Sequence, residues 1–197
     1  MSSGRSLGMH HTKQIARDYG KGVVQVTKVA FIMDGLFEDS EFRVPFDAVK
    51  DTGYEPIVIG LEAGKQLEGK KGKETVTTDV SIDDVSASDF AGLVIPGGYS
   101  PDLIRLNPKM VAFTKAMFDA RKPVAAICHA GWMIAEADIA RGRTVTSWPS
   151  IKTDLINAGA EWVDQEVVED GNLITSRMPD DLDAFTKTLL SQLGQAA

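Results

Sequence analysis

The sequence predicts an α/β protein with a single doubly wound, mainly parallel sheet sandwiched by helices and a β-hairpin near its C-terminus. From Lys28 onward, short β-rich apolar runs alternate with segments of helical periodicity, which is typical of βαβ units. An Asp-Gly pair at residues 170–171 lies between two β-rich runs and predicts the hairpin. Because there is no repeat and no second core, we expect residues 23–197 to form one domain and residues 1–22 to form a mobile arm.

The elements up to residue 98 are predicted from apolar runs and from helical spacing. An apolar, β-rich run indicates a buried strand, whereas the spacing of Phe42, Phe46 and Val49 indicates a helix. The Gly- and Lys-rich stretch from Gly60 to Lys73 predicts a loop or a hairpin. In chain order we expect a strand at 28–33, a helix at 39–53, a strand at 55–60, a short strand at 75–78, a capped helical turn at 86–90 and a strand ending in a double-glycine turn at 91–98.

The elements after residue 98 follow the same alternation. Pro108 suits the first turn of a helix, and Gly159 suits the end of one. In chain order we expect a helix at 108–122, a strand at 123–127, a helix at 131–139, a strand at 143–147, a helix at 150–160, the hairpin at 165–176 and a closing helix at 180–193.

Composition excludes several classes of function. A net charge of −7 and a pI near 5.0 argue against nucleic acid as a main partner, and the small basic stretch from Lys70 to Lys73 is expected to be a solvated loop. No apolar run is long enough for a membrane span, no N-terminal segment resembles a secretory signal, and a lone cysteine fits a reducing compartment, so we expect a cytoplasmic protein. We expect no metal and no cofactor, because the chain lacks four Cys or His ligands for zinc and has no G-x-G-x-x-G after its first strand.

The only cysteine, Cys128, is the strongest candidate for chemistry. It falls between a predicted buried strand and a predicted helix, the position of a nucleophile elbow, and His129 follows it directly. The helix N-terminus is expected to lower the pKa of the thiol, and the His129 amide is well placed to receive an oxyanion. A buried structural cysteine remains the alternative, and position alone leaves the two interpretations about equally supported.

Five motifs together identify the chain as similar to the ThiJ/PfpI superfamily, and within it to the intracellular protease PfpI branch. The resemblance runs from about Lys28 to the last helix. It is carried by FEDSEF, VIPGGYSPD, PVAAICHAGW, RGRTVTSWPSIKTDLINAGAEWVDQEVV and GNLITSRMPDDLDAF, in that order. It implies a flavodoxin-like fold of the class I glutamine amidotransferase type.

The resemblance also implies roles for individual residues. Cys128 would be the nucleophile and His129 its partner, with Glu38 as the acid that contacts the thiol. Gly98 and the His129 amide would form the oxyanion hole. Family subunits pair as dimers, and PfpI-type dimers can form hexamers in which a glutamate from a neighbouring subunit completes a triad; here that position is Asp102, one methylene shorter.

Three functions follow as expectations. The first is enzymatic work on reactive dicarbonyls or glycated protein, with a Cys128 hemithioacetal and a proton shuttle through a partly protonated Glu38. The second is peptide hydrolysis, which would need His129 as the acid for the leaving nitrogen and Asp102 from a neighbouring subunit. The third is a non-enzymatic oxidative-stress sensor or chaperone, in which Cys128 oxidises without a second cysteine to resolve it. Small carbonyl compounds or damaged proteins and peptides are therefore the expected partners, beside further copies of the chain.

Overall fold

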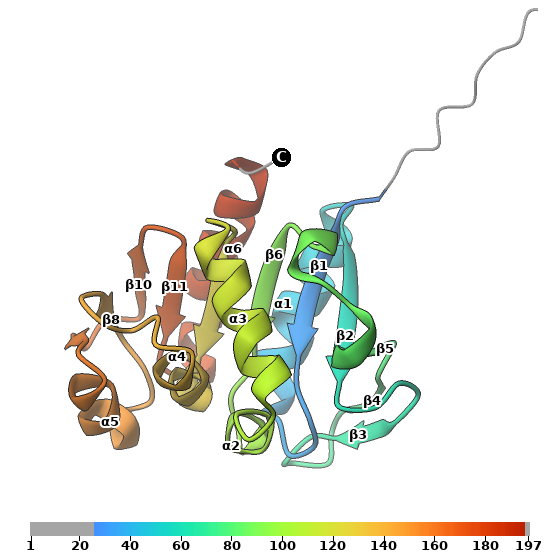
Figure 1. Ribbon diagram of the computed structural model, residues 1–197, viewed down its shortest axis with the longest axis horizontal. Helices are drawn as coiled ribbons and strands as arrows, with labels where there is room; N and C mark the ends of the chain where they lie inside the picture. Colours follow the sequence, from blue (N-terminus) through green and yellow to red (C-terminus); the bar gives the residue numbers. More distant parts are fainter. Residues whose placement is uncertain (1–25, 196–197) are drawn as a thin grey trace, which may run out of the picture.

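A seven-stranded sheet forms the centre of the molecule in the computed structural model, which describes residues 26–195 (Figure 1). The strand order is β10-β11-β7-β6-β1-β2-β5, and every neighbouring pair is parallel except β10 and β11. The doubly wound sheet and the C-terminal hairpin are thus confirmed. The strands are β1 (Lys28–Ile32), β2 (Glu55–Gly60), β5 (Val80–Ser81), β6 (Gly92–Ile95), β7 (Val124–Ile127), β10 (Val167–Asp170) and β11 (Leu173–Ser176).

Helices cover both faces of this sheet. The helices α1 (Asp39–Asp51) and α6 (Leu182–Gln195) pack together on one face, and α3 (Pro108–Asp119) and α4 (Gly131–Glu136) lie on the other. Two short helices, α2 (Ser100–Ile104) and α5 (Lys152–Asn157), extend the second layer. The central strands β1, β6 and β7 are almost wholly buried, because both of their faces are covered.

Two aromatic clusters mark the two halves of the core. Phe31 of β1 packs edge-on against Phe42 of α1 with ring centroids 6.1 Å apart, and Phe90 packs edge-on against Phe113 of α3 at 5.8 Å. Each fully buried Phe of this kind stabilises the fold by roughly 1.5–3 kcal/mol relative to exposure. The packed sheet is therefore a rigid support for the residues at the carboxyl ends of its strands.

A small hairpin lies at that carboxyl edge. It consists of β3 (Gln66–Glu68) and β4 (Thr75–Thr77), and Asp39 at the start of α1 holds its tip. The Asp39 carboxylate accepts hydrogen bonds from the backbone amides of Lys71, Lys73 and Glu74 at 2.8–2.9 Å. A carboxylate held by several amides keeps the loop between the two strands against the sheet.

Several local predictions need correction. The expected strand at 143–147 is only β8 (Thr144–Val145), and it pairs with β9 (Glu161–Trp162) outside the central sheet. The short helix α2 follows the double-glycine turn and was not predicted, because a five-residue helix carries little periodicity. The expected mobile arm at residues 1–22 lies outside the described residues. The remaining regular segments are 3₁₀ turns at Ile82–Asp84, Ala87–Asp89, Cys128–Ala130, Pro149–Ile151 and Pro179–Asp181.

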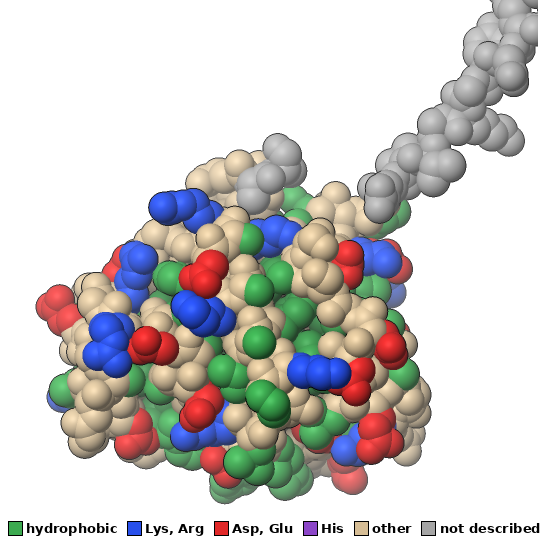
Figure 2. Space-filling view, in the orientation of Figure 1, with side chains coloured by type: hydrophobic (Ala, Val, Ile, Leu, Met, Phe, Trp, Pro, Cys, Tyr) green, Lys and Arg blue, Asp and Glu red, His purple; other side chains and the backbone are tan. Residues whose placement is uncertain are grey.

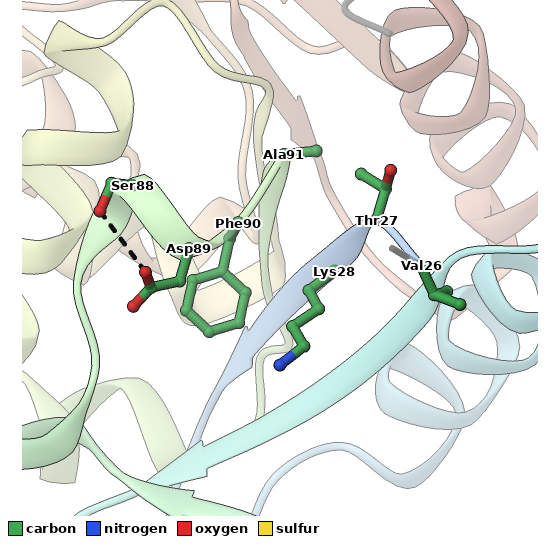
Figure 3. A pocket seen from close by; sticks show the side chains of 7 residues that line it. All are labelled: Val26, Thr27, Lys28, Ser88, Asp89, Phe90 and Ala91. Carbon is green, nitrogen blue, oxygen red and sulfur yellow. Dashed lines mark hydrogen bonds between the residues drawn. The ribbon is translucent and has the colours of Figure 1, made fainter. Parts of the chain in front are cut away.

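The described surface carries open hollows and an exposed apolar group at one end. Within residues 26–195, no helix is long and apolar enough to cross a membrane. A hollow of about 420 Å³ lies where Phe90 and Ala91 meet the residues that begin β1 (Figure 3). This hollow is at the amino ends of β1 and β6, the opposite end of the sheet from Cys128. Hydrophobic side chains instead gather at the end of the molecule where α2 lies (Figure 2), and Tyr99, Leu103 and Leu106 are the exposed ones on and beside that helix.

Candidate active site

Cys128 lies in a strained turn directly after the buried strand β7. Its φ is 62°, in the left-handed region that residues other than glycine rarely occupy, and its side chain is 5% exposed. The chain then passes through one 3₁₀ turn into α4. A buried thiol on a strained strand-to-helix turn has the geometry of a nucleophile elbow. This favours a functional over a purely structural cysteine.

Two backbone amides converge on the sulfur. The N–H groups of Gly98 and His129 both act on the Cys128 side chain and lower the pKa of its thiol. Gly98 has φ 78°, and a Cβ on it would lie 2.5 Å from both the Glu38 nitrogen and the Leu36 oxygen. Only glycine fits that position. The structure therefore brings together the two amides that the sequence suggested for an oxyanion hole.

The carboxyl group beside the thiol belongs to Glu41, not to Glu38. Glu41 is fully buried on α1, and its Oε2 accepts the Gly97 amide at 2.9 Å. A Cβ on Gly97 would lie 2.5 Å from Glu41 Oε2 and 2.7 Å from Cys128 Cβ, so the two side chains approach each other across this glycine. Among the described residues, Oε1 of Glu41 has no nitrogen or oxygen partner, and the carboxyl group faces the thiol.

Burial makes Glu41 an unusual acid. Desolvation, with a smaller contribution from the negative charge of Glu38, raises its pKa to about 8, although the Gly97 amide opposes this. Glu41 therefore holds its proton at neutral pH and can release it near that pH. A partly protonated carboxyl was expected from the sequence at Glu38, and in the structure it lies three residues further along the chain.

Glu38 has a different environment. It forms ion pairs with Lys70 at 2.7 Å and with Lys71 at 2.5 Å. Burial raises the pKa of Glu38, but the hydrogen bonds and charges of the two lysines outweigh burial and hold the pKa below its ordinary value. The assignment of Glu38 as the acid that contacts the thiol is thus not what the structure shows. Lys70 and Lys71 lie in an exposed loop, as expected from the sequence, and both in addition pair with Glu38.

The expected low pKa of the thiol is also contradicted. Burial, followed by the negative charge of Glu41, raises the pKa of Cys128 to about 12. The amides of His129 and Gly98 and the ammonium group of Lys70 act in the opposite direction but are weaker. Because Glu41 and Cys128 are buried together, ionisation of either group raises the pKa of the other. The resting site therefore keeps both protons at neutral pH.

His129 is placed to take the thiol proton. Its Nδ1 lies 3.2 Å from Cys128 Sγ, and its Nε2 lies 3.4 Å from Ser150 Oγ. Burial, followed by the charge of Lys70, lowers the pKa of His129, so the imidazole is neutral at pH 7 and can accept a proton. Trp132 and Trp148 flank the ring with centroids 5.1 and 6.3 Å away, which limits its rotation.

Asp102 does not reach this site within one chain. It is exposed on α2, and its backbone amide bonds the Tyr99 carbonyl. Within the described residues, the two hydrogen-bond contacts of the His129 ring are to Cys128 and Ser150, and no carboxylate is among them. A role for Asp102 would thus require a second copy of the chain.

A buried cysteine on an elbow at the carboxyl edge of a flavodoxin-like sheet, with a histidine and a protonated glutamate beside it, defines a cysteine-nucleophile type of site. Residues 27–192 match the model of the DJ-1/PfpI family, and the chain belongs to that family.

The match spans nearly the whole length of the relatives compared by sequence. The chain is 47% identical to Protein/nucleic acid deglycase 2 of Escherichia coli over 85% of its own length and 98% of that protein. It is 47% identical to General stress protein 18 of Bacillus subtilis over 84% and 97%. A two-domain protein of Anabaena variabilis with DJ-1/ThiJ/PfpI-like and ferritin-like domains superposes with a TM-score of 0.84 at 40% identity, over 85% of this chain and 48% of that one.

Proposed function

We propose that this protein is a stress-protective enzyme that uses Cys128 to act on reactive dicarbonyls or on the adducts they form with protein. The observation that carries the proposal is the protonated Glu41 facing the thiol across Gly97, because isomerisation of a dicarbonyl needs a group that both takes and gives a proton near neutral pH. The relative named as a deglycase supports the same chemistry.

The first step would be addition of the thiol to the aldehyde of methylglyoxal. As the sulfur–carbon bond forms, the thiol proton passes to His129 Nδ1, and the carbonyl electron pair becomes an oxyanion. The Gly98 and His129 amides are the donors available to that oxygen. Return of the proton from His129 gives a neutral hemithioacetal.

The second step would move a hydrogen between the two substrate carbons. In the fraction of molecules whose Glu41 has released its proton to solvent, the carboxylate takes the proton from the carbon bound to sulfur while solvent protonates the ketone oxygen, which gives an enediol. Glu41 then returns the proton to the neighbouring carbon, and the hydroxyl on the sulfur-bound carbon gives its proton to solvent. The product is a thioester of lactate on Cys128. Water, deprotonated by His129, cleaves that thioester, and the thiol recovers its proton as lactate leaves. A pKa of about 8 suits Glu41 to both halves of this exchange.

Peptide hydrolysis is the second candidate, and one observation favours it. His129 Nε2 faces outward to Ser150, and the exposed Asp102 lies on a helix with exposed apolar neighbours, Tyr99 and Leu103. A dimer or hexamer that buried this surface could bring Asp102 of one copy to His129 of another. Asp102→Asn would then lower peptidase activity without changing the yield of lactate from methylglyoxal.

The test of the main proposal is production of lactate. The purified protein is incubated with methylglyoxal, and lactate is followed by NMR beside Cys128→Ser. We expect lactate from the wild type and none above background from the variant. Equal yields from both, or no lactate from either, would contradict the proposal.

A further inference from the structure

The basic loop of the β3–β4 hairpin contributes two cations to the rim of the active site. Lys70 and Lys71 both bind the carboxylate of Glu38, which is 2% exposed, whereas their own side chains remain 31% and 49% exposed. The Lys70 amide also donates to the Phe37 carbonyl at 2.8 Å, which fixes the loop to the segment before α1. The cluster is therefore part of the folded structure.

This cluster adjoins the groups that hold the sulfur. The Glu38 backbone packs against Gly98, whose amide lowers the pKa of the thiol. Glu38 also donates its own amide to the Gly97 carbonyl at 3.1 Å. The charge of Lys70 acts on Cys128, His129 and Glu41 alike, lowering the pKa of all three. Lys70 thus lies within electrostatic range of the whole site.

The charges do not cancel. Two ammonium groups share the single carboxylate of Glu38, and Glu41 carries a proton at neutral pH, so this cluster has one net positive charge beside the site. The nearby carboxylate of Asp39 accepts hydrogen bonds from three backbone amides of the same loop and forms no ion pair with Lys70 or Lys71. A protein with a net charge of −7 therefore presents a local excess of positive charge where its substrate would react.

We propose that Lys70 and Lys71 make the site selective for carbonyl compounds that carry a carboxylate next to the reacting carbon, such as glyoxylate, over neutral carbonyls such as glyoxal. This inference rests on the addition step of the proposed function, because glyoxylate can form the hemithioacetal on the same thiol. It has no second carbonyl for the Glu41 step, so such a compound would be held on Cys128 and not isomerised. One ammonium group would bind the substrate carboxylate while Cys128 adds to the adjacent carbon.

Alkylation of Cys128 tests this selectivity without any turnover. Iodoacetate and iodoacetamide both react by displacement, in which the sulfur–carbon bond forms as iodide leaves and the thiol proton goes to solvent. Only iodoacetate carries a carboxylate next to its reacting carbon. The ratio of the two rate constants cancels changes in thiol ionisation and reports the charge near the sulfur. Mass spectrometry measures both rates, with free cysteine as the reference.

We expect the ratio of iodoacetate to iodoacetamide rates to be higher for the protein than for free cysteine. It should fall roughly five-fold in Lys70→Ala or Lys71→Ala and rise by a similar factor in Glu38→Gln. Lys73→Ala is the matched control, because this lysine lies in the same loop and forms no ion pair among the described residues; its ratio should stay at the wild-type value.

Unchanged ratios in both lysine variants, or a lower ratio in Glu38→Gln, would overturn the inference. If a lysine variant fails to fold, the wild-type ratio is measured against salt concentration, and it should fall as ionic strength rises. A salt-independent ratio would overturn the inference equally. Absence of lactate from methylglyoxal would refute the proposed function and leave these alkylation results unaffected, so the two failures are distinguishable.

Discussion

Replacing Glu41 by Gln should change how the stability of the protein depends on pH. Unfolded, this carboxyl has its ordinary pKa of 4.5, whereas burial raises the pKa to about 8 in the folded protein. Between these two values the unfolded chain has released the proton that the folded chain still binds. Stability from this group is therefore complete below pH 4.5 and is lost as pH rises toward 8.

The size of the effect follows from the same two pKa values. Each pH unit in this window lowers the free energy of unfolding by roughly 1.4 kcal/mol, which amounts to at most roughly 5 kcal/mol over the whole interval. Glu41→Gln removes this dependence, because glutamine does not titrate. Relative to the wild type, the variant should gain stability steadily from pH 5 to pH 8, whatever constant offset its altered hydrogen bond to Gly97 introduces.

Denaturant unfolding at half-unit steps from pH 5 to pH 8 measures this difference, and Glu38→Gln is the matched control three residues away. The lysines hold the pKa of Glu38 below its ordinary value, so its contribution is lost only as pH falls below that range. The Glu38→Gln curve should therefore run parallel to the wild type from pH 5 to about pH 7. Above that it should flatten slightly earlier, because loss of the Glu38 charge lowers the pKa of Glu41. A pH-independent difference between Glu41→Gln and the wild type would show that Glu41 is ionised throughout and that burial does not raise its pKa.

Three further predictions concern the supports of the site. Gly97→Ala places a Cβ 2.5 Å from Glu41 Oε2. The variant should lose roughly 1–3 kcal/mol of stability in denaturant unfolding and most of its Cys128-dependent activity. Wild-type stability and activity would show that the side chains of Glu41 and Cys128 are not packed across this glycine. Asp39→Ala removes the acceptor of three loop amides. Amide hydrogen exchange at Lys71 should therefore accelerate at least ten-fold. Unchanged exchange would mean that other contacts hold the loop. His129→Ala removes the group that accepts the thiol proton, so alkylation of Cys128 by iodoacetamide at pH 7 should slow, whereas an equal or faster rate would exclude that role.

The fold and the elbow could be predicted from sequence because both depend on local patterns. Apolar runs that alternate with segments of helical spacing predict the buried strands. The same pattern places Cys128 at a junction between a strand and a helix. The Gly98 amide that acts on the thiol comes from a turn thirty residues away. Its prediction rested on family resemblance, since spacing gives no such contact.

The choice between Glu38 and Glu41 could not be made from the motif FEDSEF alone. Glu38 is the cap residue before α1, whereas Glu41 lies four and eight positions before Pro45 and Val49, on the buried face of that helix. A carboxylate on an apolar helical face is itself a signal, and it would have identified Glu41. The role of Lys70 carried no such signal, because it depends on a hairpin folding back over the sheet edge.

Paired kinetics of the two glutamates test whether Glu41 is the group that transfers the proton. The rate of lactate formation from methylglyoxal is measured for the wild type, Glu41→Gln and Glu38→Gln. If Glu41 moves the proton between the substrate carbons, its variant should lose roughly 10²–10⁴-fold in kcat/KM. Glu38→Gln should change by less than about ten-fold, the order expected for a single charge near the rim of the site. A Glu41→Gln enzyme as active as the wild type, or a larger loss in Glu38→Gln, would contradict the account.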